Sequence, residues 1–311
     1  MALSGFDLAD ESSRLRVGKL MTLNLKRLVS ITFCVLVVAI FPGWLRLPKS
    51  HENAAAQKPL QLPGGNSLIV TYIANEGVLI SAGDKQVLID GLHREYKPAY
   101  LFPPAELLSA LEQARAPYNK INVVLVSHLH LDHFHPESVG LHLKNNKSAQ
   151  LISSEQIVSG LKEKFAGFAD IESRVRQVTP AWKSQTPVTV DGIKIKILGL
   201  RHSGSNFSWI QNLGHVIEIG GKKLLHIGDA DMTAENFSSF RLHEENIDIA
   251  FIPYWFLLSA NGRSLVMDQF RPKQIIAVHV PPDEAETATR EITKAIPGTI
   301  VFTKVLESKS F

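Results

Sequence analysis

The sequence predicts an α/β (α+β) fold in which two β-sheets pack together and helices lie on the outside. Pairs of strand-like runs occur early in each half of the chain, and the second half joins its pairs through the tight turns Asp191-Gly192 and Gly220-Gly221. Residues 121–126 (INVVLV) form a short continuous apolar run, which is typical of a strand buried on both faces. Helical spacing of apolar residues appears between the later strands. These three observations favour sheets in the centre and helices outside.

The elements follow one another after an N-terminal region. Strands are expected at residues 68–73, 77–81, 86–89, 121–126, 150–153, 188–190, 193–200, 215–219, 223–227, 247–252 and 274–279. Helices are expected at residues 105–114, 155–165 and 284–295. The chain therefore divides into a targeting or anchor segment (1–49), a linker rich in Ala, Pro and Gly (50–65), and a folded domain (66–311).

Composition excludes several classes of protein. The 311 residues include 33 Lys and Arg against 30 Asp and Glu, with 45% hydrophobic residues, as in an ordinary globular protein. Residues 1–60 hold eight of the basic and four of the acidic residues, so the rest of the chain is close to neutral. A nucleic-acid partner is therefore not expected. Cys34 is the only cysteine, which excludes an intrachain disulfide and a cysteine-based metal site.

The N-terminal region contains an uncharged apolar run, Leu28–Phe41, which follows Lys26-Arg27. Its 14 residues are fewer than the roughly 20 that span a membrane, but they suit the core of a signal peptide. Met21 is an alternative start, and small residues at 54–56 offer a cleavage site, although far from the run. The other interpretation is an uncleaved anchor that associates with a membrane through residues 28–45. We expect an exported (periplasmic or extracytoplasmic) or membrane-anchored protein.

A dense group of potential metal ligands follows the buried strand. The segment Ser127-His128-Leu129-His130-Leu131-Asp132-His133 places four such side chains within six positions. Imidazole and carboxylate groups are the ligands of zinc, iron and manganese in proteins. In a loop, the first two histidines can face one ion while the aspartate and the last histidine face another. Solubility alone does not require this spacing, so the segment indicates a metal site.

The HLHLDH segment resembles the HxHxDH signature of the metallo-β-lactamase superfamily, and the resemblance covers about residues 66–311. Three further elements of that family occur in order: His202 after a strand, Asp229 after Gly228 at a strand end, and His279 after the run Ile275–Val278. The resemblance implies a four-layer αββα sandwich made of two mixed β-sheets flanked by helices.

The resemblance also implies a ligand set for two divalent metal ions, with zinc favoured and iron or manganese as alternatives. One ion would lie on His128, His130 and His202, the second on Asp132, His133 and His279, and Asp229 would bridge them. Two such cations lower the pKa of a shared water to about 7, so that a metal-bound hydroxide attacks a carbonyl carbon or a phosphorus. Asp132 would orient this nucleophile while acting as a ligand.

Other polar residues compete for roles in this site. His215 is an alternative third ligand, but it lies inside a strand and too close to Asp229 for the intervening hairpin, which favours His202. His226 precedes Asp229 on the same strand and is expected to support the ligands or the core. Asp90 resembles the family's structural aspartate, and Asp231 resembles a helix cap.

These observations favour a metal-dependent hydrolase of an ester, a lactone or a phosphodiester. A mononuclear iron oxidoreductase of the dioxygenase type is the alternative, and a non-catalytic scaffold is a third interpretation that the complete ligand set disfavours. The lack of a site cysteine disfavours the best-known zinc β-lactamases. The stretch Leu92–Phe102, which includes Tyr96 and Tyr100, follows the strand that ends at Asp90 and is expected to line the mouth of the site. A small-molecule or lipid-like substrate is expected, because further aromatic residues lie close in sequence to the ligand-bearing loops. These residues, most of which would also suit a core, are Phe134, Phe207, Trp209, Tyr254, Trp255 and Phe256.

Overall fold

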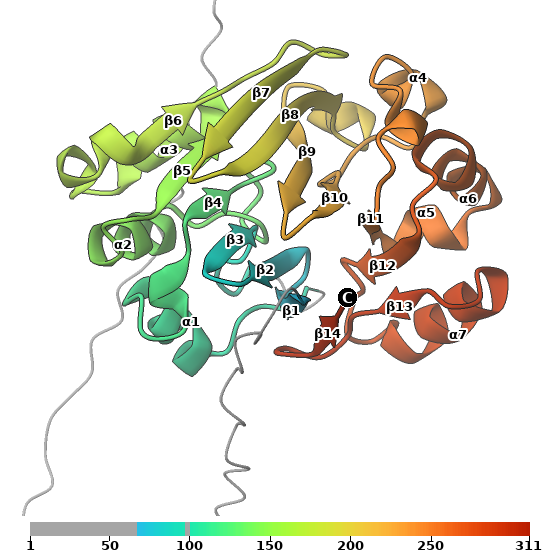
Figure 1. Ribbon diagram of the computed structural model, residues 1–311, viewed down its shortest axis with the longest axis horizontal. Coiled ribbons are helices and arrows are strands. Elements are labelled where there is room, and N and C mark those ends of the chain that lie inside the picture. The colour runs from blue at the N-terminus through green and yellow to red at the C-terminus, as the bar shows by residue number, and fades with distance from the viewer. Residues whose placement is uncertain (1–66, 97–99) are drawn as a thin grey trace, which may run out of the picture. The chain divides into compact units, whose positions relative to one another are not determined.

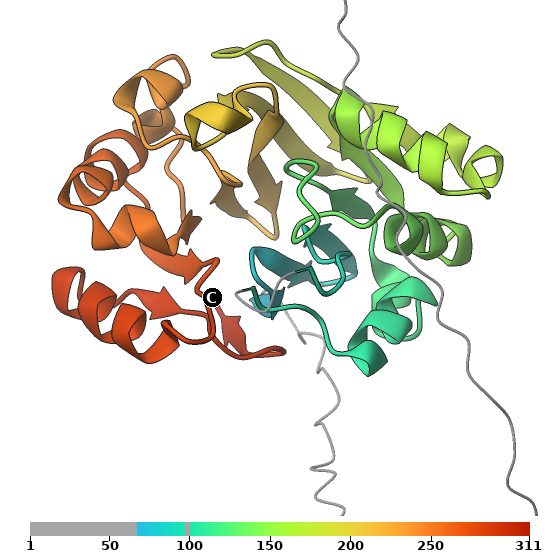
Figure 2. The same ribbon diagram turned by 180° about the vertical axis from the view of Figure 1, so that it is seen from behind.

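Residues 67–96 and 100–311 are described by a computed structural model of the chain, and the predicted targeting segment and linker lie outside them. Two mixed β-sheets of seven strands each form the centre. Helices α1–α3 (green) cover one side and helices α4–α7 (orange to red) cover the other, as the two opposite views agree (Figures 1 and 2). This arrangement confirms the predicted αββα sandwich.

The first sheet has the strand order β14-β1-β2-β3-β4-β5-β6. Its strands are β1 (Leu68–Ala74), β2 (Gly77–Ala82), β3 (Lys85–Ile89), β4 (Val123–Leu125), β5 (Gln150–Ser153), β6 (Val175–Gln177) and β14 (Ser308–Ser310). Strands β14 to β3 pair antiparallel, whereas β3 to β6 pair parallel. The carboxyl ends of β3, β4 and β5 therefore meet at one edge of the sheet.

The second sheet has the strand order β13-β12-β11-β10-β9-β8-β7. Its strands are β7 (Gln185–Val190), β8 (Ile193–Arg201), β9 (Gln211–Ile219), β10 (Lys222–His226), β11 (Ile249–Pro253), β12 (Gln274–Val278) and β13 (Ile300–Val301). Strands β7 to β10 pair antiparallel and β10 to β13 pair parallel, so this sheet combines a meander with a parallel part in the same way as the first.

The helices complete the outer layers. They are α1 (Ala105–Glu112), α2 (Pro136–Asn145), α3 (Glu155–Lys164), α4 (Ala234–Phe237), α5 (Tyr254–Leu258), α6 (Ala260–Leu265) and α7 (Ala285–Ala295). Helix α3 begins where the Ser154 hydroxyl accepts a hydrogen bond from the Ile157 N–H. Its buried residues Ile157 and Leu161 are four positions apart, as are Ala288 and Ile292 of α7, so each helix turns one apolar stripe toward a sheet.

Three apolar cores hold the four layers together. The central core lies between the sheets and contains Val70, Ile80 and Ile217, among others. A second core joins the first sheet to α1–α3, and a third joins the second sheet to α4–α7. Alternate residues of one strand serve different cores: Ile80 faces the central core, while its neighbour Leu79 faces the helices.

Most of the predicted elements are present with ends shifted by a few residues, but some were missed. Helix α2 was not predicted, because PESVGLHLKN has weak helical periodicity and contains Gly140. That glycine is needed for packing, since a Cβ on it would lie 2.2 Å from the ring of Phe165, beyond the end of α3. The short strands β6, β13 and β14 were also missed. Their two or three residues carry too little pattern to be recognised without their neighbours.

The location expected from the N-terminal sequence needs correction. Within residues 67–96 and 100–311, no helix is long and apolar enough to cross a membrane. The longest α-helix there, α7, has 11 residues and so measures about 16 Å, whereas the hydrocarbon core of a bilayer is about 30 Å thick. The apolar run Leu28–Phe41 lies outside the described residues. We therefore withdraw the assignment to an exported or membrane-anchored location.

Candidate metal centre

Residues 127–133, here called the motif loop, leave the first sheet at the end of β4. Strand β4 is buried on both faces, so the chain turns into the loop only at the sheet edge. Asp90, which follows β3, anchors the loop from below. Its Oδ1 accepts the Ser127 N–H at 2.7 Å, and its Oδ2 accepts the Ser127 hydroxyl at 2.5 Å and the Nδ1 of His133 at 3.0 Å. Asp90 therefore has the structural role that the sequence predicted.

Three candidate ligands come from the second sheet, each at the end of a different strand. His202 follows β8, Asp229 follows β10, and His279 follows β12. Gly228 allows the two sheets to approach closely before Asp229, because its φ is +55° and a Cβ there would lie 2.8 Å from the Cβ of Ser127. Backbone hydrogen bonds also join neighbouring loops, since the Ser203 N–H donates to the Asp229 carbonyl at 2.7 Å.

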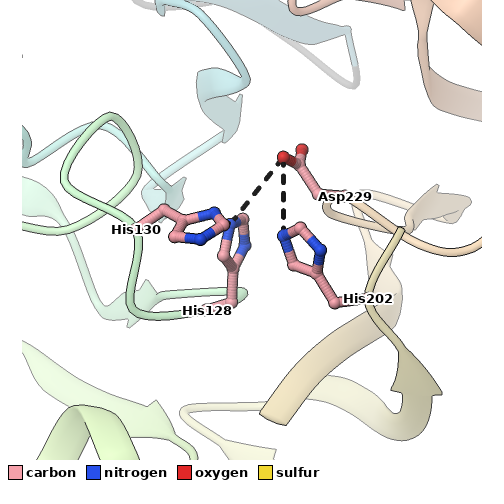
Figure 3. A group of neighbouring side chains, drawn as sticks. All are labelled: His128, His130, His202 and Asp229. Atoms are coloured by element: carbon pink, nitrogen blue, oxygen red, sulfur yellow. Dashed lines mark hydrogen bonds and ion pairs between the residues drawn. The ribbon is translucent and has the colours of Figure 1, made fainter. Parts of the chain in front are cut away.

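The structure brings all seven sequence-predicted ligands together. Figure 3 shows His128, His130 and His202, here called the first ligand group, with the carboxylate of Asp229 beside them. The Oδ2 of Asp229 lies 3.8 Å from the Nε2 of His128 and 3.7 Å from the Nε2 of His202. The Nδ1 of His130 lies 3.0 Å from the Nε2 of His128. One ligand atom from each of these four residues fits within 4.8 Å of the others.

The second ligand group consists of Asp132, His133 and His279. The Oδ2 of Asp132 lies 3.6 Å from the Nε2 of His133 and 3.4 Å from the Nε2 of His279. The other oxygen of Asp229, Oδ1, lies 3.5 Å and 3.6 Å from the same two nitrogens. The two oxygens of one carboxylate thus face the two groups separately, which is the arrangement expected of a bridging ligand.

The hydrogen bonds around the histidines suit cation binding. Nδ1 of His133 donates to Asp90, and Nδ1 of His202 donates to the Ser203 carbonyl at 2.6 Å. The Ser127 hydroxyl gives its only proton to Asp90, so it accepts from Nδ1 of His128. In each of these rings Nε2 faces the centre, where the Nε2 of His128 lies beside the Nδ1 of His130. Among the described residues, the buried Nε2 atoms of His133, His202 and His279 and Oδ1 of Asp229 have no hydrogen-bond partner, as expected where a cation completes the site.

The electrostatics of the cluster also favour cations. Burial, together with the imidazoles of His133 and His202, lowers the pKa of His128 well below its ordinary value, so this ring is neutral and available as a ligand. Burial alone would lower the pKa of His133, but Asp229 and Asp132 outweigh it and raise that pKa. Burial alone would raise the pKa of Asp132, and His133 and His279 outweigh it, which keeps the carboxylate ionised.

Other histidines are kept out of the cluster. His215 lies inside β9 and is fully buried, and its ring centroid lies 6.2 Å from that of His226. His202, and not His215, is therefore the third histidine of the first ligand group. The Nε2 of His226 lies 3.2 Å from the backbone carbonyl oxygen of Glu76, so His226 supports the core beneath the site. Asp231 is not the cap of α4, because Thr233 occupies that position.

Sequence reasoning missed two polar residues in the turn between β1 and β2. The amide of Asn75 contacts Asp132, and the carboxyl group of Glu76 is fully buried behind the ligands. Burial and the nearby Asp229 raise the pKa of Glu76 well above its ordinary value. The available signal was an Asn-Glu pair between two apolar strands, but nothing local indicates that this turn faces a loop more than 50 residues away.

A cavity of about 410 Å³ opens above the two ligand groups. Five aromatic side chains line it, namely Tyr96, Tyr100, Phe207, Tyr254 and Trp255. Of the aromatic residues singled out in the sequence, Phe134 and Phe256 are buried in the cores, whereas Trp209 is 61% exposed and lines a separate cavity of about 220 Å³. The sequence therefore indicated rings of the cavity, including Tyr96 and Tyr100, together with some rings of the core.

Known proteins are similar to this chain in sequence or in fold. Residues 86–302 match the family described as the beta-lactamase superfamily domain. A curated relative, a UPF0173 metal-dependent hydrolase of Thermus thermophilus, is 26% identical over 246 residues, which cover 74% of this chain and 93% of the relative.

Two solved structures are similar in fold. The metallo-beta-lactamase fold protein YhfI of Bacillus subtilis matches with a TM-score of 0.54 and 14% identity over 79% of this chain and 99% of that one. CmlA, a diiron β-hydroxylase from Streptomyces venezuelae, matches with a TM-score of 0.50 and 12% identity over 80% of this chain and 55% of that one. At these identities the two likenesses show the fold alone.

Proposed function

The chain belongs to the beta-lactamase superfamily domain family, and from that premise we propose that it is a metal-dependent hydrolase with two divalent cations, zinc being favoured. The observation that carries the proposal is the carboxylate of Asp229, whose two oxygens face two separate groups of ligand atoms. The name of the Thermus thermophilus relative supports the same reaction class.

The seven candidate ligands would hold two cations. His128, His130 and His202 would hold one cation, Asp132, His133 and His279 the other, and Asp229 would contact both. When bound, such cations lower the pKa of a shared water and stabilise negative charge that develops on the substrate. Asp132 remains ionised beside His133 and His279, so it can accept a hydrogen bond from the attacking water and orient it. Asp90 keeps the motif loop in place during the reaction.

The proposed substrate is an ester, a lactone or a phosphodiester with an apolar part, either a small molecule or a lipid-like compound. The aromatic side chains that line the cavity support an apolar part, because contact with such rings removes apolar surface from water. Leu131 and Phe207 lie on the ligand-bearing loops and are 46% and 42% exposed.

Elemental analysis tests the two-cation site. The full-length chain, purified without added metal, is analysed for its elements beside Asp229→Ala and the control Asp231→Ala, whose carboxylate contacts the Thr233 hydroxyl. We expect about two zinc ions per chain in the parent and in the control, and loss of at least one from Asp229→Ala. A single iron with thiol-dependent oxygen uptake would replace the proposal with the dioxygenase alternative, and a chain that binds no metal after reconstitution would end it.

The substrate class is tested on the metal-loaded protein with matched series of p-nitrophenyl esters, lactones and phosphodiesters that differ only in the length of the apolar chain. We expect kcat/KM to rise with chain length by about tenfold or more, because ~1.4 kcal/mol of added apolar contact gives a tenfold change. Equal or faster hydrolysis of the shortest, most polar members would contradict an apolar substrate.

A further inference from the structure

Asn75 lies in the turn between β1 and β2 and belongs to neither ligand group. It is 1% exposed and has a left-handed backbone, with φ at +54°. Its amide nitrogen Nδ2 lies 3.1 Å from Oδ2 of Asp132 and 3.2 Å from the Asp132 carbonyl oxygen, and donates to both. Its own backbone carbonyl accepts the N–H of His279 at 2.8 Å. One residue therefore contacts two members of the second ligand group.

The two contacts reach across the molecule. Asp132 belongs to the motif loop of the first sheet, whereas His279 follows β12 of the second sheet. The turn between β1 and β2 contacts both residues, although it is far from each of them in the sequence. The His279 backbone is itself left-handed, with φ at +60°, so a partner for its N–H helps to keep it in that conformation.

The atom that Asn75 contacts is the one that matters for cation binding. Oδ2 of Asp132 is the oxygen that faces the Nε2 atoms of His133 and His279. A carboxylate oxygen has two lone pairs, so a donated N–H can occupy one and leave the other for a cation. The amide is neutral and donates, so it fixes the carboxylate without adding charge.

On these observations we propose that Asn75 is a positioning residue for the second cation, acting through the carboxylate of Asp132. The proposal rests on the two-cation function proposed above. A turn at this place requires only a residue that tolerates a left-handed backbone, a condition glycine also meets. The amide hydrogen bonds to Asp132 are an additional feature, and Asn75→Gly removes them while it keeps the backbone conformation and the bond to His279.

The test uses the full-length chain, stripped of metal with a chelator and titrated with Zn²⁺ against a chromophoric competitor. The variants are Asn75→Gly and Asn246→Gly. Asn246 is a matched control, since it has φ at +55° and its amide donates to a carbonyl on the exposed surface. We expect the parent and the control to bind two ions with the same affinities. Asn75→Gly should bind the first ion normally and the second about 10–100-fold more weakly, as is usual when a ligand loses its hydrogen-bond partner.

The outcomes separate this inference from the proposed function. A parent chain that binds fewer than two ions would contradict the two-cation site itself. Two ions in the parent with unchanged affinities in Asn75→Gly would overturn the role of Asn75 alone. Equal weakening of both ions would indicate a general disturbance and would also overturn it. Urea unfolding of the metal-free proteins provides a second measurement. Asn75→Gly should lose some stability with its two buried hydrogen bonds but remain folded under the titration conditions, so that weaker binding of the second ion alone reports on the site.

Discussion

The two sheets contribute ligands in different ways. The first sheet supplies four of them from one continuous loop, residues 128–133, whereas the second supplies His202, Asp229 and His279 from the ends of three strands. The loop depends for most of its side-chain support on one buried carboxylate, Asp90, and Asn75 adds two hydrogen bonds to Asp132. The dispersed ligands depend on sheet register and on backbone contacts between neighbouring strand ends.

This difference has a structural consequence. A loop with one main anchor is vulnerable at that anchor, because its removal leaves several buried donors without partners at once. Ligands on separate strands are each fixed by many ladder hydrogen bonds, so they are vulnerable mainly where the sheets touch. Gly228 marks that point of contact.

The largest effect is expected from Asp90→Ala. The change leaves the Ser127 N–H and hydroxyl and the Nδ1 of His133 without their acceptor, so we expect a loss of about 4 kcal/mol in the free energy of unfolding, together with loss of bound metal. Urea denaturation and elemental analysis measure the two effects. Asp248→Ala is the control. Asp248 also accepts a backbone N–H, but it contacts Lys223 and Lys273 and not the motif loop, so this variant should keep its metal. Normal metal content in Asp90→Ala would contradict the role of Asp90 as the main anchor of the motif loop.

A smaller but still large effect is expected from Gly228→Ala. The new Cβ would lie 2.8 Å from the Cβ of Ser127, in the motif loop of the first sheet, and 2.5 Å from Oδ1 of Asn212, and it would stand on a left-handed backbone. We therefore expect a loss of about 3 kcal/mol in the free energy of unfolding and weaker metal binding at Asp229. Gly221→Ala separates the two causes, because Gly221 is also left-handed, at +72°, but has no atom within 4 Å of the added Cβ. That control should lose about 1 kcal/mol and no metal. Equal losses in the two variants would show that contact between the sheets is unimportant.

The smallest effect concerns the free energy of unfolding at acidic pH. Buried, neutral histidines in both halves of the domain contribute to it. Burial lowers the pKa of His142, in α2, to about 4, and burial with the neighbouring His226 lowers that of His215, in β9, to about 3. Between pH 6.5 and these values the unfolded chain binds more protons than the folded one, so the free energy of unfolding falls as the pH falls.

Two variants test this contribution on the metal-free protein. His142→Gln removes one titrating ring and keeps a donor for the Leu111 carbonyl, which now lies 2.7 Å from the Nδ1 of His142. The free energy of unfolding is measured with urea at about pH 6.5 and about pH 4.5. Its decrease between these two pH values should be about 2 kcal/mol smaller in His142→Gln than in the parent. The exposed His243 supplies the control His243→Gln, which should follow the parent. Identical pH dependence in all three proteins would mean that His142 is not the group responsible.

Much of the fold was predictable because its signals are local. The runs that became β1 to β3 and β8 to β12 are apolar, and tight turns separate several of them, so their spans agree with the observed strands to within a few residues. The choice of His202 over His215 was also local, because it depended on where a strand ends. The weakest predictions were short strands such as β14, which forms only by pairing with β1 more than 200 residues away.

The sequence by itself determined the types of ligand and their order along the chain, because the HLHLDH motif and the strand-end residues are local features. Only the tertiary structure decided that the two oxygens of Asp229 face different groups, that Asn75 contacts Asp132, and that Phe134 and Phe256 belong to the cores and not to the cavity. These contacts depend on the packing of two sheets against each other. A local pattern shows which side chains reach the edge of a sheet, whereas the distances between edges follow from sheet packing and strand register.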